Sequence, residues 1–533
     1  MGRRNGKALV RIGYSPALLS PASVRNRGAL RQKKGFDPMR LKINQKRVLG
    51  KRDPMIYGHF IEHFHRQIYG GLYDPKSPFS DEKGLRLDVL EAMRKIKVPV
   101  LRWPGGCFAS SYHWKDAVGP ERKPYFDKAW RVEESNAFGT DEYMDLCEKL
   151  GCQPYICTNA GTGTSEEMSD WVEYCNLERE GRYAKWRSEN GHPRPYGVKY
   201  WSIGNENYGD WEIGAKSAQQ WGRLVKESAK MIKHIDPTTE LTAAALTDLD
   251  WNISLLKNCS DFLDWISIHE YWDPLQEKNQ CATYEEAMAY TNHVDDSIEN
   301  IQGLLTAMNL KGKIKIAFDE WNLRSWYHPN VFHQPMGVTK EEYLTPRDEN
   351  DQNATYTMAD AVFSACFLNA CNRHCDVVKM ANFAPTVNTR GCIFTYDEGI
   401  VLRSTYHVFD LYVNLLGDTV VDCWCEDAPK MTVKSKAGAL EEIQIIDALA
   451  TMKKDSAILS LVNKDPGSGR ALDVDFGAAP KEYRLHTLTG KAADSYNDIG
   501  KNEIFPVASQ WLPFDGSSLT LPPHSVTIAE YRF

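Results

Sequence analysis

The chain has 533 residues, of which 42% are hydrophobic and 25% charged, a globular composition that excludes a disordered or fibrous chain and allows two to four domains. Residues 41–533 hold 54 basic and 70 acidic side chains, so this acidic body gives no electrostatic reason to expect nucleic acid or an anionic membrane as a partner. No window approaches the roughly 20 apolar residues of a membrane span.

Residues 1–38 form a basic leader that is rich in Arg, Ser, Pro and Gly and has no hydrophobic period. Its apolar stretches are shorter than the core of about 7–15 residues that a secretory signal needs. We expect the leader to be disordered, or derived from an expression vector or an upstream start codon, with Met39 as the natural start. An organellar transit peptide is the alternative.

The chain contains 13 cysteines, an odd number without the regular spacing of a disulfide framework. This predicts reduced thiols and a cytoplasmic protein. The group Cys366, Cys371, His374 and Cys375 matches no zinc-binding pattern, and packing within a helix explains it better. We therefore expect no metal and no organic cofactor.

Eight apolar or β-branched runs between residues 55 and 400 predict strands that alternate with amphipathic helices, which is typical of parallel strands with right-handed crossovers. The runs are Ile56–His63, Pro99–Gly106, Gln153–Gly161, Val198–Glu206, Glu240–Leu246, Asp264–Trp272, Lys313–Asn322 and Val377–Pro385. The helical stretches include Leu85–Lys97, Asp141–Leu150, Glu166–Cys175, Ala215–Ile235, Tyr284–Asn309 and Ala354–Cys371.

Eight such units predict an α/β protein with a (β/α)8 TIM barrel over 55–400, because no strand is followed by the GxGxxG turn of a doubly wound sheet. After residue 400 the helical period gives way to short alternating runs, which indicate an antiparallel, jelly-roll-like β-sandwich over 401–533. We expect residues 39–54, which contain the strand-like Leu41–Val48, to join the sandwich. Its other predicted strands are Met431–Lys436, Glu442–Ile446, Ala457–Asn463, Leu472–Phe476, Tyr483–Leu488 and Ser525–Phe533.

Two carboxylates stand at the carboxyl ends of barrel strands, where a TIM barrel places its active site. Glu206 ends the fourth run directly after Asn205, and Glu320 lies near the end of the seventh. A pair of facing carboxylates is what hydrolysis of an acetal linkage requires, one attacking the anomeric carbon and the other protonating the leaving oxygen. Taken singly, either Glu would more often be a solvated loop residue.

Several motifs together resemble glycoside hydrolase family 51, whose best-known members are α-L-arabinofuranosidases. They are residues 58–73, Arg102–Gly106, Tyr112–Asp116, Asn159–Thr164, Asn205-Glu206, Asp319–Asn322 and Leu521–Val526. The similarity covers roughly residues 39–533. The resemblance implies a retaining glycosidase. It also implies a homo-oligomer, because members of this family are often hexamers.

The resemblance also implies roles for individual residues. Glu206 corresponds to the acid/base, Glu320 to the nucleophile and Glu62 to a sugar-binding Glu. A general acid that works near neutral pH needs a raised pKa, which apolar neighbours such as Trp201 and Trp211 would supply. Further substrate-binding candidates are Asn205 at the sugar 2-hydroxyl, His269 and Tyr271 beside the nucleophile, and Trp103, Trp321, Cys107 and Asn388.

Each of these candidates has an alternative. Glu62 with His63 and His65 resembles a metal trio without an obvious fourth ligand. His269 fits a core histidine equally well, and Arg102 fits a salt bridge inside the barrel. Trp103, Trp321 and Trp326 fit either the core or sugar platforms.

The chain departs from the family pattern at two places. Cys107 stands where many members have a sugar-binding Asn, and Cys accepts hydrogen bonds weakly. A family Gln near Pro385 is missing, and Asn382 or Asn388 is a possible substitute. Both departures bear on substrate preference.

The long segment Arg324–Asn353 lies between the seventh and eighth runs. It is expected to cover the sugar pocket or to form a contact between subunits.

The predicted function is an exo-acting, retaining α-L-arabinofuranosidase that releases terminal arabinofuranosyl residues from arabinoxylan or arabinan oligosaccharides. An endo-β-1,4-glucanase or xylanase with the same carboxylate pair is the nearest alternative. A catalytically silent carbohydrate-binding protein and a metal-dependent barrel enzyme are more distant ones.

Overall fold

The structure, a computed structural model, describes residues 39–274, 280–325, 352–426 and 428–533. They all belong to one compact unit, Pro38–Phe533. Within these ranges no helix is both long enough and apolar enough to cross a bilayer. The predicted leader, residues 1–38, lies outside them.

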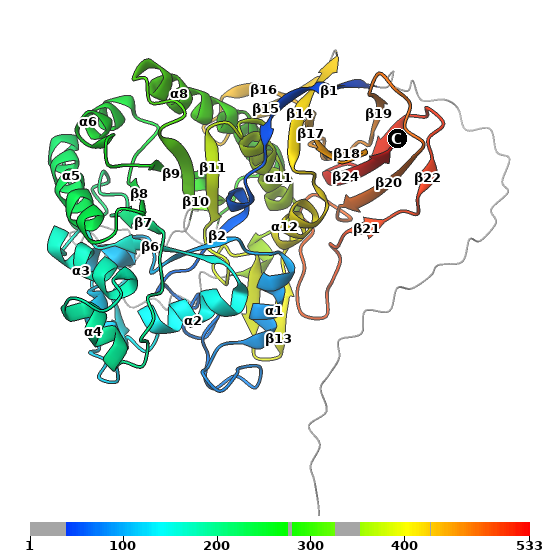
Figure 1. The fold of residues 1–533 in the computed structure, drawn as a ribbon. Helices are drawn as coiled ribbons and strands as arrows, with labels where there is room; N and C mark the ends of the chain where they lie inside the picture. The colour runs from blue at the N-terminus through cyan, green and yellow to red at the C-terminus, as the bar shows by residue number, and fades with distance from the viewer. Residues whose placement is uncertain (1–38, 275–279, 326–351, 427) are drawn as a thin grey trace, which may run out of the picture. The chain divides into compact units, whose positions relative to one another are not determined.

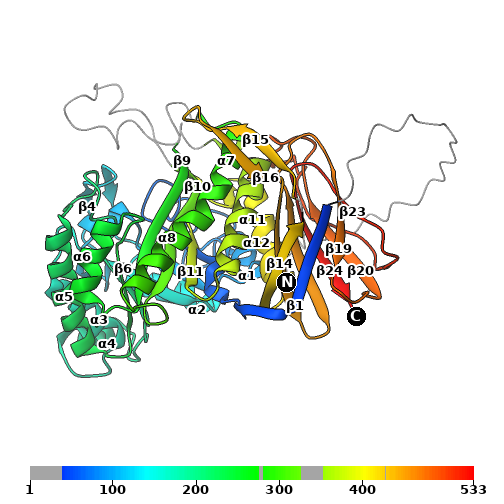
Figure 2. The same cartoon turned by 90° about the horizontal axis from the view of Figure 1, so that it is seen from above.

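Eight parallel strands form a barrel, shown in Figures 1 and 2, as the sequence predicts. In spatial order the strands are β8 (Glu240–Ala243), β7 (Tyr200–Ile203), β6 (Gln153–Thr158), β3 (Val100–Trp103), β2 (Gly58–Phe60), β11 (Val378–Phe383), β10 (Lys315–Ser325) and β9 (Trp265–Pro274). A parallel bridge between Ala244, which follows β8, and Ser267, near the beginning of β9, closes the barrel.

Helices surround the barrel in chain order. They are α1 (Leu87–Lys95), α2 (Thr140–Leu150), α3 (Ser165–Asn176), α4 (Arg182–Glu189), α5 (Ala218–Ile235), α6 (Leu249–Cys259), α7 (Tyr284–Ala289), α8 (His293–Ala307), α11 (Met358–Arg373) and α12 (Ser404–Leu415). The single helix predicted over 284–309 is interrupted by a short 3-10 turn, Tyr290–Asn292, between α7 and α8.

Two apolar layers hold the barrel together. Inside it, one side chain from each of six strands forms a small packed cluster at the level where the strands begin, as in other barrels of this size. The cluster consists of Val100, Tyr155, Tyr200, Trp265, Ala317 and Met380. A much larger cluster fills the space between strands and helices. The polar site described below therefore occupies only the opposite end of the barrel.

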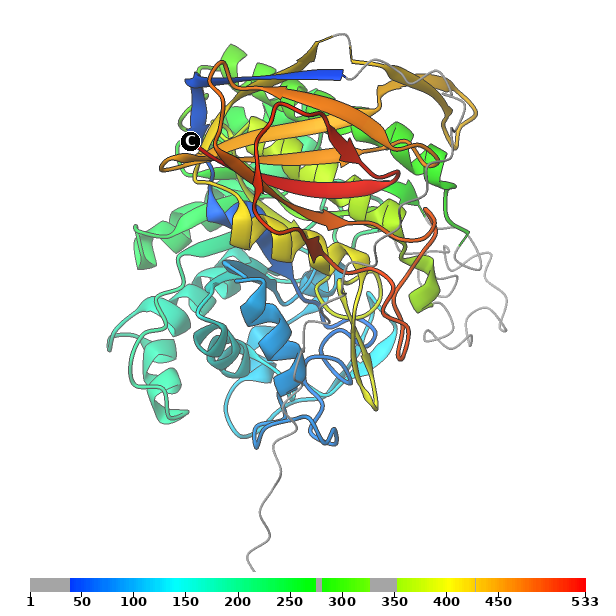
Figure 3. The ribbon, with the colours of Figure 1, turned by 90° about the vertical axis from the view of Figure 1, so that its right-hand side faces the viewer.

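The C-terminal domain is a ten-stranded sheet that curls around its own core, which agrees with the predicted sandwich (Figure 3). Its strands are β1 (Met39–Lys51), β14 (Thr419–Glu426), β17 (Ile446–Lys453), β18 (Ser456–Asn463), β19 (Arg470–Asp475), β20 (Glu482–Leu488), β21 (Val507–Ala508), β22 (Leu512–Pro513), β23 (Leu519–Leu521) and β24 (Ser525–Arg532). One pair, β1 with β19, is parallel, because the N-terminal strand enters between β14 and β19.

Two predicted sandwich strands lie elsewhere. β15 (Lys430–Lys434) and β16 (Leu440–Gln444) pair only with each other and form a separate hairpin. This hairpin contacts α7 of the barrel, and the side chain of Asn292 donates a hydrogen bond to the backbone of Glu442.

Helix α11 lies between the barrel and the sandwich. It contacts β10 on one side and β17, β18 and β24 on the other, and nearly all its residues are buried. Helix α12 follows the eighth barrel strand, at residues where the sequence shows no helical period. The period is absent because α12 is also buried on most of its surface, so no polar face alternates with an apolar one.

All thirteen cysteines are free thiols, and most of them are buried. Cys366 and Cys371 lie in the core on α11, as expected from helical packing.

A buried arginine joins the end of β10 to its neighbours. Arg324 donates two hydrogen bonds to Asp360 on α11 and one, of 2.7 Å, to Asp273 on β9. Asp273 also accepts a hydrogen bond from Lys436, which lies in the turn of the β15–β16 hairpin. These bonds hold the strand that carries Glu320.

Replacing Arg324 with Met leaves the buried Asp360 without its cationic partner and Asp273 with Lys436 alone, and we expect it to cost about 3–5 kcal/mol of folding free energy. The exposed pair Arg532–Glu482 is the matched control, for which Arg532→Met should cost less than about 1 kcal/mol. Urea unfolding followed by circular dichroism measures both. Equal midpoint shifts in the two variants would contradict this account.

Candidate active site

A buried arginine occupies the centre of the site. Arg102 on β3 is fully buried, and its Nη1 donates to Glu320 Oε2 at 2.7 Å. Its Nη2 donates to Asn205 Oδ1 at 2.8 Å, and its Nε lies 3.5 Å from Asp319 Oδ2. The guanidinium on β3 therefore joins side chains of β10 to one from the turn after β7, and these segments are far apart in the sequence.

The pairing of β9 with β10 places the groups around the nucleophile candidate. Glu320 is in register with His269, and the register shifts between Ala317 and Glu320. Such a bulge changes the alternation of side chains, and here both Asp319 and Glu320 reach Arg102 inside the barrel. The hydroxyl of Tyr271, two residues beyond His269, donates to Glu320 Oε1 at 2.6 Å.

Glu206 lies on a tight turn after β7. Its φ of 43° and that of Gly204, 70°, are in the left-handed region, which turns the chain sharply at the barrel mouth. His269 Nδ1 is 2.9 Å from Glu206 Oε1, and Trp211 Nε1 donates to Oε2 at 2.8 Å. One carboxylate oxygen each of Glu206 and Glu320 and one ring nitrogen of His269 all lie within 4.8 Å of one another.

The spacing of the two carboxylates bears on the chemistry. Retaining glycosidases hold their carboxyl groups about 5–5.5 Å apart, whereas inverting ones leave about 6.5–9.5 Å for a water molecule. One oxygen of Glu206 lies within 4.8 Å of one oxygen of Glu320, so the two carboxyl groups are close together at the barrel mouth.

Charge at the site is dominated by His269. Burial alone would lower its pKa, but the charges of Glu320 and Asp319 and the hydrogen bond to Glu206 raise the pKa to about 10. Burial opposes ionisation of Glu206, yet the hydrogen bonds of His269 and Trp211 hold the pKa of Glu206 below its usual value. This differs from the raised pKa that the sequence predicts for the acid, because a cation stands beside it.

Glu62 follows β2 and is held by three donors. Its Oε1 accepts hydrogen bonds from the backbone of Gly106 and Phe108 and from Trp130 Nε1, at 2.9 to 3.2 Å. Burial and the nearby charge of Glu320 raise the pKa of Glu62 to about 7. Oε2 takes part in none of these bonds, so it remains for a ligand.

Another carboxyl group, Glu212, lies beside the acid/base candidate. It is 4% exposed, and its Oε2 accepts a hydrogen bond of 3.3 Å from Asn205 Nδ2. One carboxylate oxygen each of Glu212 and Glu206 and the Sγ atom of Cys107 lie within 4.8 Å of one another. Burial and the charge of Glu206 raise the pKa of Glu212 to about 8. Burial also raises the pKa of the Cys107 thiol.

Three tryptophans that the sequence associates with the site face the surrounding core instead. Trp103 stacks on Tyr143 and Trp321 on Phe367, both on the helix side of the barrel. Trp201 donates to the backbone near the start of its own strand. Trp103 and Trp321 are therefore not positioned as sugar platforms, because side chains next to an inward residue on a strand point outward.

Asn388 is a further site candidate that the structure places elsewhere. It has a φ of 54° and bonds the backbone of Arg66 and both the amide and the hydroxyl of Thr395, so its side chain holds a turn. Asn382 likewise bonds the backbone of His59. Residues 326–351 of the predicted covering segment, Trp326 among them, lie outside the described residues.

Some residues of the site escaped sequence reasoning. Asp319, Arg390, Trp130 and Glu212 were not identified, although Asp319 directly precedes Glu320. Arg390 reaches the hydroxyl of Tyr271 at 3.3 Å from a loop after the eighth strand. Only the adjacency of Asp319 offered a signal; the others depend on loop conformation.

Among the described residues, two groups of three side chains are close enough to hold a metal cation. They are Glu206, His269 and Glu320, and Cys107, Glu206 and Glu212. In the first, mutual hydrogen bonds and the His269 charge account for the closeness.

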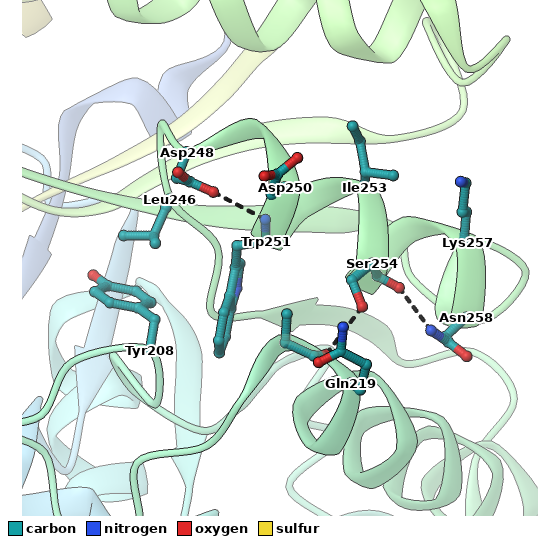
Figure 4. A pocket seen from close by; sticks show the side chains of 11 residues that line it. Tyr208, Gln219, Leu246, Asp248, Asp250, Trp251, Ile253, Ser254, Lys257 and Asn258 are labelled. Atoms are coloured by element: carbon teal, nitrogen blue, oxygen red, sulfur yellow. Dashed lines mark hydrogen bonds between the residues drawn. The ribbon is translucent and has the colours of Figure 1, made fainter.

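A separate cavity of about 620 Å³ lies between α5 and α6. Figure 4 shows Tyr208, Leu246 and Trp251 gathered at one end and Lys257 and Asn258 at the other. Neither Glu206 nor Glu320 lines it.

Comparisons with known proteins identify the family. Two family profiles match: "Alpha-L-arabinofuranosidase 1 domain" over residues 92–289 and "Alpha-L-arabinofuranosidase C-terminal domain" over residues 319–525. A probable α-L-arabinofuranosidase C of Aspergillus clavatus is 33% identical over 518 residues, 92% of this chain and 96% of that protein.

Two bacterial proteins are similarly close. An intracellular exo-α-(1→5)-L-arabinofuranosidase of Acetivibrio thermocellus is 30% identical over 90% of this chain and 96% of its own length. The crystal structure of a Thermotoga maritima α-L-arabinofuranosidase with arabinose superposes with a TM-score of 0.82 at 33% identity, over 93% of this chain and 100% of that one.

The shared proton of Glu206 and His269 gives a pH prediction. The pair titrates together, so loss of its last proton at high pH is set by His269, whose pKa is raised to about 10. In His269→Asn that proton is held by Glu206 alone. We expect the alkaline limb of kcat/KM on an aryl arabinoside to move to lower pH.

The matched control is His113→Asn. His113 also contacts a Glu, Glu167, at 2.8 Å, but outside the site, and the pH profile should not move. An unchanged alkaline limb in His269→Asn would contradict the shared proton.

Proposed function

The chain belongs to glycoside hydrolase family 51, the α-L-arabinofuranosidases, and on this premise we propose that it releases terminal arabinofuranosyl residues with retention of configuration. The observation that carries the proposal is the closeness of Glu206 and Glu320 oxygens around one histidine at the barrel mouth. The substrates are oligosaccharides of arabinoxylan or arabinan.

In the first step, the ionised Glu320 attacks the anomeric carbon, and the bond to the leaving oxygen breaks. Arg102 and Tyr271 fix the two oxygens of Glu320, so the attacking group needs no reorientation. The electron pair of the broken bond goes to the leaving oxygen, which takes a proton from Glu206 as Glu206 takes one from His269 Nδ1. A covalent arabinosyl ester on Glu320 results.

The proton for this step is stored beside Glu206. In the free protein it resides on His269, whose Nδ1 is 2.9 Å from Glu206 Oε1. Formation of the ester removes the negative charge of Glu320 and with it part of the force that keeps His269 protonated. In the second step Glu206 takes a proton from water, which attacks the anomeric carbon and displaces Glu320. The proton then passes from Glu206 back to His269, which restores the starting state. Neither step requires a metal ion or an organic cofactor.

Sugar hydroxyl groups are bound by the groups around the pair. Glu62 offers Oε2, and Asn205 offers the remaining N–H of its amide, since Arg102 holds the amide oxygen. Hydrogen bonds to the 2-hydroxyl strengthen in the transition state, which is the role we assign to Asn205.

The setting of the reaction is part of the same proposal. The Acetivibrio relative is named intracellular and exo-acting, and the thirteen free thiols suit a reducing compartment. A cytoplasmic protein would act on short oligosaccharides rather than intact polymer. A homo-oligomer is the state of assembly that the family resemblance implies.

The endo-acting glucanase or xylanase alternative is less supported. The curated relatives that match over most of the chain carry arabinofuranosidase names, and one is named exo-acting.

Hydrolysis of 4-nitrophenyl α-L-arabinofuranoside, beside a β-xyloside and carboxymethylcellulose, tests the proposal. We expect arabinoside turnover by the wild type and a loss of about 10⁴-fold or more in Glu320→Ala. Glu206→Ala should lose about 10²–10⁴-fold on arabinobiose, whose leaving group needs protonation, and less on the aryl substrate. Azide should accelerate Glu206→Ala and give an arabinosyl azide.

The control is Glu270→Gln, which changes a partly buried carboxyl group on β9 that accepts a hydrogen bond from Ser297. Cleavage of cellulose without arabinoside turnover would replace the donor sugar with a β-glucan unit, and full activity of Glu320→Ala would refute the nucleophile.

A further inference from the structure

One carboxyl group near the acid/base has no role in the double displacement. Glu212 is buried, and only one of its oxygens, Oε2, is hydrogen-bonded, to Asn205 Nδ2. Its Oε1 has no hydrogen-bond partner among the described residues. A buried polar atom without a partner costs free energy, so it calls for an explanation.

The position of Glu212 indicates which part of a substrate would reach it. Two groups of three side chains cluster at the site, and they share only Glu206. Glu320 and His269 form one group, at the anomeric carbon. Glu212 and Cys107 form the other. The leaving oxygen departs beside the acid/base, so Glu212 and Cys107 are the candidates to face the leaving-group sugar.

The surroundings of Glu206 also open on this side. Trp211, next to Glu212 in the chain, donates to Glu206 and is 57% exposed. The ring of Tyr208 stands edge-on to that of Trp211, with centroids 6.1 Å apart. Exposed aromatic rings beside buried polar groups are a common setting for a sugar ring.

We propose that Glu212 is a specificity-determining residue, whose Oε1 binds a hydroxyl group of the leaving-group sugar beside Glu206. This inference rests on the proposed function. Cys107 lines the same place with a thiol, which is a weak hydrogen-bonding group, so Glu212 is the strong polar group there.

The protonation state of Glu212 fits this role. The titratable groups that face it are Glu206, Glu62 and Cys107, and Ser110 adds a hydroxyl. Burial and the charge of Glu206 raise its pKa to about 8, so at neutral pH it is a carboxylic acid. Since Oε2 accepts from Asn205, the proton is on Oε1, which can donate it to a sugar oxygen.

Two substrates with the same donor sugar separate this role from others. Arabinobiose has a sugar leaving group, and 4-nitrophenyl α-L-arabinofuranoside has none. We expect Glu212→Met to lower kcat/KM on arabinobiose about tenfold more than on the aryl substrate. Loss of the Asn205 contact alone would lower both equally, because both place the same sugar against Asn205.

Glu212→Gln tests the neutral acid. Its amide reproduces the acceptor and the donor of the carboxylic acid, so it should keep the wild-type ratio of the two kcat/KM values at pH 7. Above pH 8 the ratio should fall in the wild type, as Glu212 ionises, and stay constant in Glu212→Gln. Glu270→Met, which removes a partly buried carboxyl group of β9, should leave the ratio unchanged.

An unchanged ratio in Glu212→Met, with both substrates hydrolysed by the wild type, would overturn the inference but leave the proposed function intact. Hydrolysis of neither substrate by the wild type would instead contradict the proposed function.

Discussion

The buried guanidinium of Arg102 is the constraint on which the site depends. It sits inside the barrel, where an unpaired charge would be prohibitively costly, and it is compensated by Glu320 and Asp319 and bonded to Asn205. Its planar fork fixes these groups in one orientation each. The nucleophile and the amide beside the acid/base are thereby positioned relative to each other before any sugar binds.

The same charge balance extends to His269. Three carboxylates surround its ring, and together they outweigh the cost of burying a cation. Glu206 is therefore ionised in the free protein, and His269 carries the proton. A site of this kind changes protonation as Glu320 changes charge, which couples the two steps of a double displacement.

The fold and the carboxylate pair were predictable from the sequence, since the eight runs are regular and strand ends define the mouth of a barrel. Helix α12 was not, because burial on most of its surface erases the helical period. Trp103 and Trp321 were wrongly assigned to the sugar pocket. Each directly follows a residue that points into the barrel, so its own side chain points outward. Glu212 and Trp130 were inaccessible to pattern reasoning, because irregular loops bring them to the site.

The central claim is that Glu320 forms a covalent bond to the sugar while Glu206 handles the proton. Mass spectrometry of rapidly quenched Glu206→Ala, mixed with 4-nitrophenyl α-L-arabinofuranoside and digested, tests it directly. The account predicts one arabinosyl group on the peptide that contains Glu320. Unmodified peptide during steady-state turnover, or the sugar on another residue, would contradict it.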